Sequence, residues 1–179
     1  VEERGLMNNL LKNHDFYLNI PADYKLAKET DNFLWIRHYT HEMDKNILIY
    51  HQEYDDEKIF EDQSIFELRE KLVRQYLRDI EDTTIFMLTE TLMPLSTKKI
   101  NFDGKYAVEA RGLWKLSDIS MGGPFLSYIF EDENRNRLYY IEGYVASPGK
   151  TKRETIREME IILKTFKTRE EYQELKENS

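Results

Sequence analysis

Apolar residues recur at the three- and four-residue spacing of a helix with one buried face in three segments of the chain. The first is residues 4–13, where this face holds Leu6, Met7, Leu10 and Leu11. The second follows Ser64 and has Ile65, Leu68, Leu72, Val73, Tyr76 and Ile80, while Arg69, Glu70 and Arg74 are expected to face solvent. The third follows Thr151 and has Ile156, Met159, Ile162, Leu163 and Phe166.

Capping-box pairs, a Ser or Thr with a Glu three residues later, predict where helices begin. They are Ser64 with Glu67, Thr151 with Glu154, and Thr168 with Glu171. The last pair predicts a short helix within residues 167–179. Because that segment offers few apolar side chains, we expect it to be a loosely held tail.

Stretches rich in aromatic and β-branched residues lie between the predicted helices and are typical of strands. They cover residues 25–30, 33–39, 46–54, 84–90, 99–102, 105–116, 124–130 and 137–146. Polar turns join several of them, and Asp103-Gly104 is a strong hairpin signal. Since tight turns favour antiparallel neighbours, the predicted fold class is α+β, with an antiparallel sheet of about six to eight strands packed against helices.

The stretch GLWKLSDISMGGPF, residues 112–125, holds three of the seven glycines. Strand alternation places Trp114 on the side of Val108, which favours a core position for its ring. Gly122 and Gly123 are expected to allow positive φ before Pro124, in a crossover between two hairpins. A binding loop over residues 119–124 is the alternative interpretation.

Composition excludes several classes of function. Thirty-four acidic against twenty-six basic residues give a net charge of −8, which repels a nucleic-acid backbone. The absence of cysteine excludes disulfides, thiolate zinc sites and thiol nucleophiles. We find no apolar run long enough to span a membrane, and the start at Val1 suggests a processed protein or an excised fragment.

Candidate catalytic and metal-binding groups are few. His38, His41 and His51 fall near one predicted hairpin and could hold zinc with Glu42 or Glu53, but a known ligand spacing is missing. Carboxylates form runs at residues 53–57, 61–62 and 131–133, where we expect solvent to surround them. Nucleophile, phosphate-loop and dinucleotide motifs are absent, so we predict no catalytic residue, no metal and no cofactor.

One group of side chains suggests a ligand surface. Alternation puts Trp35 and Arg37 on one face of their strand, and likewise Glu109 and Arg111 on one face of theirs. Arginine and tryptophan on a sheet can bind an anionic or glycan-like ligand, whereas a cross-strand ion pair is the simpler alternative. The candidate ligand-binding residues are Trp35, Arg37, Glu109, Arg111, Gly122 and Gly123.

Four segments resemble an uncharacterised family of Bacteroidetes envelope lipoproteins, a domain-of-unknown-function family. They read IPADYKLAKETDNFLWIRH, NILIY, FDGKYAVEARGLWKLSDISMGGPFLSY and YYIEGYVASPGKTKRETIREMEIIL, within residues 5 to 166. The resemblance implies a preceding N-terminal portion with a signal peptide and a lipidated cysteine, and a periplasmic or outer-membrane-anchored location. The order of elements is also similar to PsbP-like domains, which serve mostly as binding or assembly modules.

Together these observations predict one domain over residues 1–166, followed by the tail. The favoured function is a non-enzymatic envelope module that binds a protein partner or an anionic or glycan-like ligand. One alternative is a hydrolase that uses a carboxylate pair or a histidine-bound metal. The other is a structural domain that supports a missing N-terminal portion.

Overall fold

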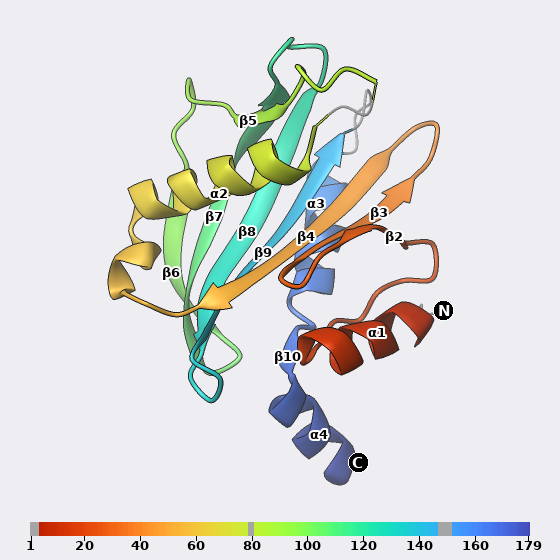
Figure 1. Cartoon of the computed structure of the whole chain (residues 1–179), viewed down its shortest axis with the longest axis vertical. Coiled ribbons are helices and arrows are strands. Elements are labelled where there is room, and N and C mark those ends of the chain that lie inside the picture. The colour runs from red at the N-terminus through yellow and green to blue at the C-terminus, as the bar shows by residue number, and fades with distance from the viewer. Residues whose placement is uncertain (1–3, 79–80, 147–151) are drawn as a thin grey trace.

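The structure is a computed structural model that describes residues 4–78, 81–146 and 152–179. Its centre is an antiparallel sheet of eight strands, drawn in Figure 1. In spatial order these are β2 (Lys25–Glu29), β3 (Phe33–Tyr39), β4 (Asp44–Glu53), β9 (Arg137–Ala146), β8 (Gly122–Asp132), β7 (Lys105–Leu116) and β5 (Met87–Thr89), with β6 (Ser96–Phe102) also paired to β7. Two short strands, β1 (Phe16–Tyr17) and β10 (Lys167–Thr168), pair separately. The predicted α+β class is confirmed.

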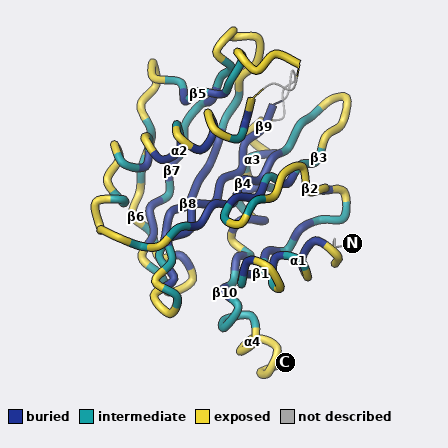
Figure 2. Tube along the Cα trace, in the orientation of Figure 1, coloured by how far each residue is buried: buried dark blue, intermediate teal, exposed yellow. Residues whose placement is uncertain are grey.

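Helices cover both faces of this sheet. The 3-10 helix η1 (Glu57–Phe60) leads into α2 (Asp62–Tyr76), which packs on one face. On the opposite face lie α1 (Arg4–His14) and α3 (Lys152–Leu163). We call these sides the α2 face and the α3 face. Each has its own apolar core, and the central strands between them are the most buried part of the chain in Figure 2.

Two of the predicted helix starts can be compared with the structure. The prediction of a capping box at Ser64 is wrong, because α2 begins at Asp62 after the N-cap Glu61, whose side chain makes no capping hydrogen bond. Glu67 instead accepts a hydrogen bond from Gln63 at 2.8 Å. The box of Thr168 and Glu171 is confirmed at the start of α4 (Arg169–Glu177). Thr151 and Ile80 lie outside the described residues.

The predicted hairpins are confirmed. Strand β3 pairs with β4, β6 with β7 and β8 with β9, each antiparallel. Asp103 and Gly104 both take positive φ, 51° and 83°, as a two-residue turn of this kind requires. The strand predicted over 84–90 is shorter and covers only Met87–Thr89, because a turn on Asp82 occupies the residues before it.

The glycine-rich stretch is a hairpin and not a crossover. Lys115 of β7 pairs with Gly122 of β8, and neither Gly122 nor Gly123 has positive φ; Ile119 takes it instead, at 57°. A Cβ added to Gly123 would lie 2.0 Å from the carbonyl oxygen of Val145, so this glycine is needed for close packing of strands. The core position predicted for Trp114 is confirmed, with its Nε1 donating to that same oxygen at 3.1 Å.

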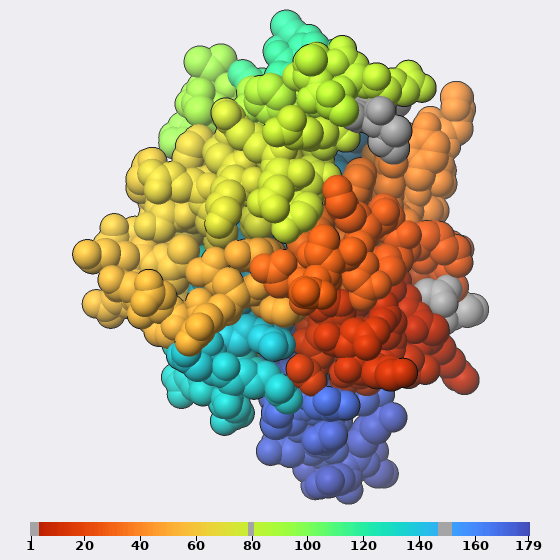
Figure 3. Space-filling model, in the orientation of Figure 1, coloured from red at the N-terminus to blue at the C-terminus, as the bar shows by residue number. Residues whose placement is uncertain are grey.

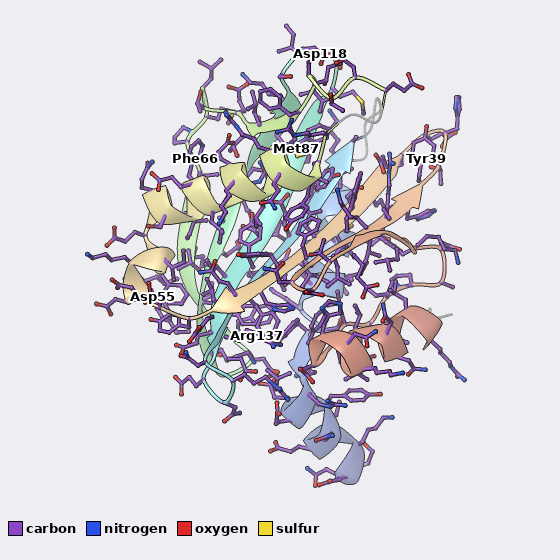
Figure 4. All side chains as sticks on the ribbon, viewed as in Figure 1. Tyr39, Asp55, Phe66, Met87, Asp118 and Arg137 are labelled. Carbon is purple, nitrogen blue, oxygen red and sulfur yellow. The ribbon has the colours of Figure 1, made fainter. Side chains whose placement is uncertain are left out.

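Arg69 is buried, which corrects the prediction that it faces solvent. Its Nε and Nη2 donate to the two oxygens of Glu142 on β9, at 2.7 and 3.0 Å. Its Nη1 donates to Thr89 at 2.8 Å, and the guanidinium lies 3.9 Å from the ring centre of Phe125. Its Nη2 also lies 3.6 Å from the sulfur of Met87 on β5, a residue labelled in Figure 4, so the guanidinium is held between α2 and the sheet.

The C-terminal tail contacts three distant parts of the chain. Arg169 donates to Asp15 at 2.8 Å, Arg135 to Glu170 at 2.6 Å, and Lys105 to Glu171 at 2.6 Å. The ring of Tyr17 also stacks on Tyr172, with centroids 4.5 Å apart. How tightly these contacts hold residues 167–179 stays a prediction for measurement.

Candidate functional site

The predicted ligand surface is divided between two faces of the sheet. Trp35 packs at the edge of the core on the α2 face. Arg111, by contrast, reaches Glu160 of α3 and therefore lies on the α3 face with Glu109. The sheet separates the two pairs, so they do not form one surface.

Each predicted arginine is already engaged within the chain. Arg37 donates through Nε and Nη2 to both oxygens of Asp44 at 2.7 Å, and its guanidinium lies 5.5 Å from the Trp35 ring. Trp35 in turn donates to Asn46 at 2.8 Å. Such bidentate pairs satisfy the geometry of arginine, so this cluster matches the ion-pair alternative of the sequence analysis.

Arg111 is held in the same way on the other face. Its Nε donates to Glu109 at 2.9 Å and its Nη2 to Glu160 at 3.2 Å. Tyr128 also donates to Glu109, at 3.2 Å. Gly122 and Gly123 lie in β8 and take part in none of these contacts. A ligand at Arg111 would have to compete with two carboxylates.

The histidines do not gather at the hairpin of β3 and β4. His38 packs beside Tyr24, with ring centroids 5.5 Å apart, and His41 is exposed in the turn. His51 faces His14 of α1 instead. Among the residues that the structure describes, no three His, Cys, Asp or Glu side chains come close enough to hold a metal ion.

A hollow of about 950 Å³ lies at the lower end of the sheet, between η1, the β6–β7 turn, the β8–β9 turn and α4. We call it the lower hollow. Figure 3 shows the residues of η1, the β8–β9 turn and α4 along this end of the molecule. Three rings line the hollow: Tyr54, Phe60 and Tyr106. Phe60 meets Tyr106 edge to face, with centroids 5.1 Å apart.

Backbone and side-chain contacts position this lining. The amide of Tyr54 donates to the carbonyl of Asn136 at 2.9 Å, which fixes the end of β4 against the β8–β9 turn. Asp56 caps η1 by accepting from the amide of Lys58 at 3.0 Å. Thr97 of β6 donates to Asp62 at 2.7 Å and ties the start of α2 to the sheet.

The lower hollow is strongly acidic. Its seven carboxylates outnumber its three lysines and give it a net charge of −4; they are Glu57, Glu61, Asp62, Glu131, Asp132, Glu133 and Glu171, against Lys58, Lys99 and Lys105. Half of the net charge of the whole chain is thus concentrated here. An environment of this sign attracts cations and repels anions.

Asp132 carries an unsatisfied carboxylate oxygen. The residue is only 2% exposed, which corrects the expectation of a solvated carboxylate at this position, whereas Glu133 is exposed as expected. Its Oδ1 accepts from the amide of Asn134, whereas its Oδ2 has no hydrogen-bond partner within the described chain and lies 3.9 Å from Nε of Arg135. Burial raises the pKa of Asp132, and burial together with Glu133 and Asp132 raises the pKa of Glu131.

The sequence analysis identified the carboxylates that line the lower hollow, but it did not predict that they lie close together. The carboxylate runs at 53–57, 61–62 and 131–133 were visible, as was the polar turn DENRNR. Their convergence depends on β9 lying between β4 and β8, which brings the end of β4 to the β8–β9 turn. Local patterns carry no signal for that order.

Comparisons with solved structures show distant similarities. A crystal structure from Bacteroides thetaiotaomicron is 13% identical with a TM-score of 0.41, over 87% of this chain and 45% of that one. The Saccharomyces cerevisiae Ran-binding protein Mog1p is 8% identical with a TM-score of 0.49, over 89% and 93%. The chain thus spans less than half the length of the Bacteroides protein.

No curated protein matches the chain. Within the described residues, no helix combines the length and apolar character needed to cross a membrane. The family model described as a domain of unknown function, DUF4837, matches residues 3–165. Since this match covers most of the sequence, the chain belongs to the DUF4837 family.

Proposed function

We propose that the chain is a non-enzymatic binding module of the cell envelope, and that its lower hollow receives a cationic segment of a protein partner. The observation that supports this is the coincidence of seven carboxylates and three aromatic rings in one hollow. Its volume of about 950 Å³ lies within the range of ligand sites, roughly 300–1,000 Å³.

Lysine and arginine side chains suit this lining better than other groups. Their charge complements the net −4 of the hollow, and their apolar stems can pack on the rings of Tyr54, Phe60 and Tyr106. An anionic ligand is a poorer match at this position because of the negative charge.

The location in the envelope and a lipid tether rest on the resemblance described for the sequence, as does the comparison with PsbP-like binding modules. Fractionation of cells that express the full-length gene product tests the location. We expect the protein in the membrane fraction, and incorporation of a labelled fatty acid tests the tether. Recovery only from the cytoplasmic fraction would contradict this part of the proposal.

Titration with an oligolysine peptide tests the lower hollow directly. We expect saturable binding that weakens with salt, because exposed charges are screened. Glu57→Gln together with Glu131→Gln should weaken binding by roughly 5- to 30-fold, at about 0.5–1 kcal/mol for each charge removed.

The matched control is Glu174→Gln together with Glu177→Gln. These residues lie on the exposed side of α4 outside the hollow, and their replacement changes the net charge equally. The control should bind as the unaltered protein does. Equal weakening in both double variants would show attraction by net charge alone, and the proposed site would be wrong.

A further inference from the structure

A second, smaller hollow of about 380 Å³ lies on the other side of the β8–β9 turn. We call it the His51 hollow. All of its lining side chains are polar, and Glu53 is the one carboxylate among the described residues that line it. It lies beside the start of β9, near the position labelled Arg137 in Figure 4.

Arg137 supplies hydrogen-bond donors to this hollow. Gln52 does not add its amide, because its Oε1 accepts from the Tyr50 hydroxyl at 3.0 Å on the α2 face, opposite to His51. Arg137 uses Nη1 for its hydrogen bonds to the His14 carbonyl at 3.1 Å and the Tyr139 hydroxyl at 3.3 Å. The Asp15 carboxylate also lies 3.9 Å from Nη1. Among the described residues, Nε and Nη2 make no hydrogen bond, and together they form a fork of donors that fits a carboxylate or phosphate group.

A buried chain of three side chains fixes the orientation of His51. Glu29 lies 2.8 Å from Nε2 of His14, and Nδ1 of His14 faces Nε2 of His51 at 3.4 Å. Because a carboxylate only accepts, His14 donates to Glu29 from Nε2; with a neutral His14, Nδ1 then accepts from the Nε2–H of His51. The hydrogen-bond network thus assigns Nδ1 as the nitrogen of His51 that is free to take up a proton.

We propose that the His51 hollow binds a small oxyanion, a carboxylate or a phosphate group, and that His51 takes up one proton as the anion binds. Arg137 supplies the charged fork and His51 the proton-dependent contact. Glu29 and His14 act as positioning residues that hold the ring of His51. This site is separate from the lower hollow, and neither proposal depends on the other.

The charges around His51 explain why anion binding and proton uptake are coupled. Burial, then the charge of Arg137 and then His14 lower the pKa of His51 to about 4, and Asp15 opposes them. Tyr139 contacts the ring edge to face, with centroids 5.8 Å apart. His51 is therefore neutral at pH 7 in the free protein. An anion beside it favours the imidazolium and raises its pKa, so binding draws a proton from solution.

Calorimetric titration of the full chain with sulfate and, separately, with acetate tests this proposal. Sulfate stands for the phosphate group and keeps its charge between pH 5.5 and 7.5; acetate stands for the carboxylate. We expect saturable binding of at least one probe, tighter at lower pH by up to about tenfold per pH unit as one proton is linked. The apparent enthalpy should vary with the ionisation enthalpy of the buffer. The probe that binds more tightly identifies the group.

Variants separate the roles of the residues. Arg137→Gln should weaken binding at least tenfold, and Arg137→Lys should recover only part of it because the fork is lost. The control Arg153→Gln removes an equally charged, exposed residue of α3 and should have no effect. His51→Gln should abolish proton uptake and the pH dependence of sulfate binding, while the control His38→Gln should keep both.

Three results would overturn the proposal. They are the absence of saturable binding of both probes, equal affinity of the Arg137→Gln variant with a native melting curve, and binding without proton uptake. If Arg137→Gln fails to fold, the comparison of Arg137→Lys with the unaltered protein tests whether Arg137 binds the anion. His51→Gln tests whether His51 takes up the proton.

Discussion

Replacing Arg69 by methionine should destabilise the protein severely, because it would leave a carboxylate buried without its partner. Glu142 is fully buried and Arg69 is 1% exposed. Burial alone would lower the pKa of Arg69, but the charge and hydrogen bonds of Glu142 outweigh it and raise that pKa above its ordinary value. Arg69 therefore keeps its charge in the folded state, between α2 and β9.

The magnitude follows from removing one partner of a buried pair. Breaking such a pair costs about 3–5 kcal/mol, whereas exchanging both partners for apolar residues of similar size is often nearly neutral. Tyr140 donates to Glu142 at 2.6 Å, and Thr89 accepts from Arg69, so the double exchange leaves two hydroxyls without these partners. We expect about 1–3 kcal/mol of destabilisation from each such hydroxyl at most.

Urea unfolding of Arg69→Met, Glu142→Met and the double variant measures the cycle. We expect each single variant to lose about 3–5 kcal/mol of unfolding free energy, which corresponds to a fall in Tm of roughly 6–20 °C at this chain length. The double variant should be more stable than the sum of the single losses predicts, by several kcal/mol of coupling. Additive losses would refute the idea that the pair is a coupled unit.

Four further predictions concern other parts of the chain. The pKa of His51 is about 4 in the folded chain against an ordinary 6.5, so between these pH values the unfolded chain binds one more proton than the folded chain. The free energy of unfolding should therefore fall by about 3 kcal/mol from pH 6.5 to pH 4, and by less in His51→Gln. Gly123→Ala should cost roughly 1–3 kcal/mol or more through its clash with a β9 carbonyl, whereas Gly104→Asn, in open space, should cost little in the same unfolding assay. Arg111→Ala should lower Tm, because it leaves Glu109 and Glu160 without the guanidinium between them; an unchanged Tm with weaker retention of an anionic ligand would instead make Arg111 a ligand-binding residue. Amide exchange should be faster in residues 167–179 than in α3 if the tail is loosely held, and equal protection would contradict that expectation.

Arg69 shows how the residue type misled the sequence interpretation. The position is four residues after Ile65 and four before Val73, so helical spacing placed it on the buried face. Its charge argued for the solvent side, since lone charges are rarely buried. The partner that makes burial possible, Glu142, lies more than seventy residues away on β9. Spacing carried the correct signal, and only the tertiary structure supplied the reason.

For the candidate ligand residues, too, the sequence predicted the local arrangement and only the tertiary structure gave their surroundings. Alternation along β3 and β7 correctly assigned which side chains share a face of one strand. It could not say that the pair on β3 faces α2 while the pair on β7 faces α3, because the two faces of a strand are equivalent until the sheet is assembled. The chain of Glu29, His14 and His51 similarly joins α1, β2 and β4, and a local pattern contains no trace of it.

The sequence by itself determined the helices, the hairpins and the α+β class of this protein, because each depends on residues close together in the chain. Spacing, turn chemistry at Asp103-Gly104 and the Thr168 capping box act over a few residues and need no distant partner. Tertiary structure decided which charges are buried and where the two hollows lie. Those features depend on the order of strands β4, β9, β8 and β7, which is selected by the packing of the whole sheet between its helices.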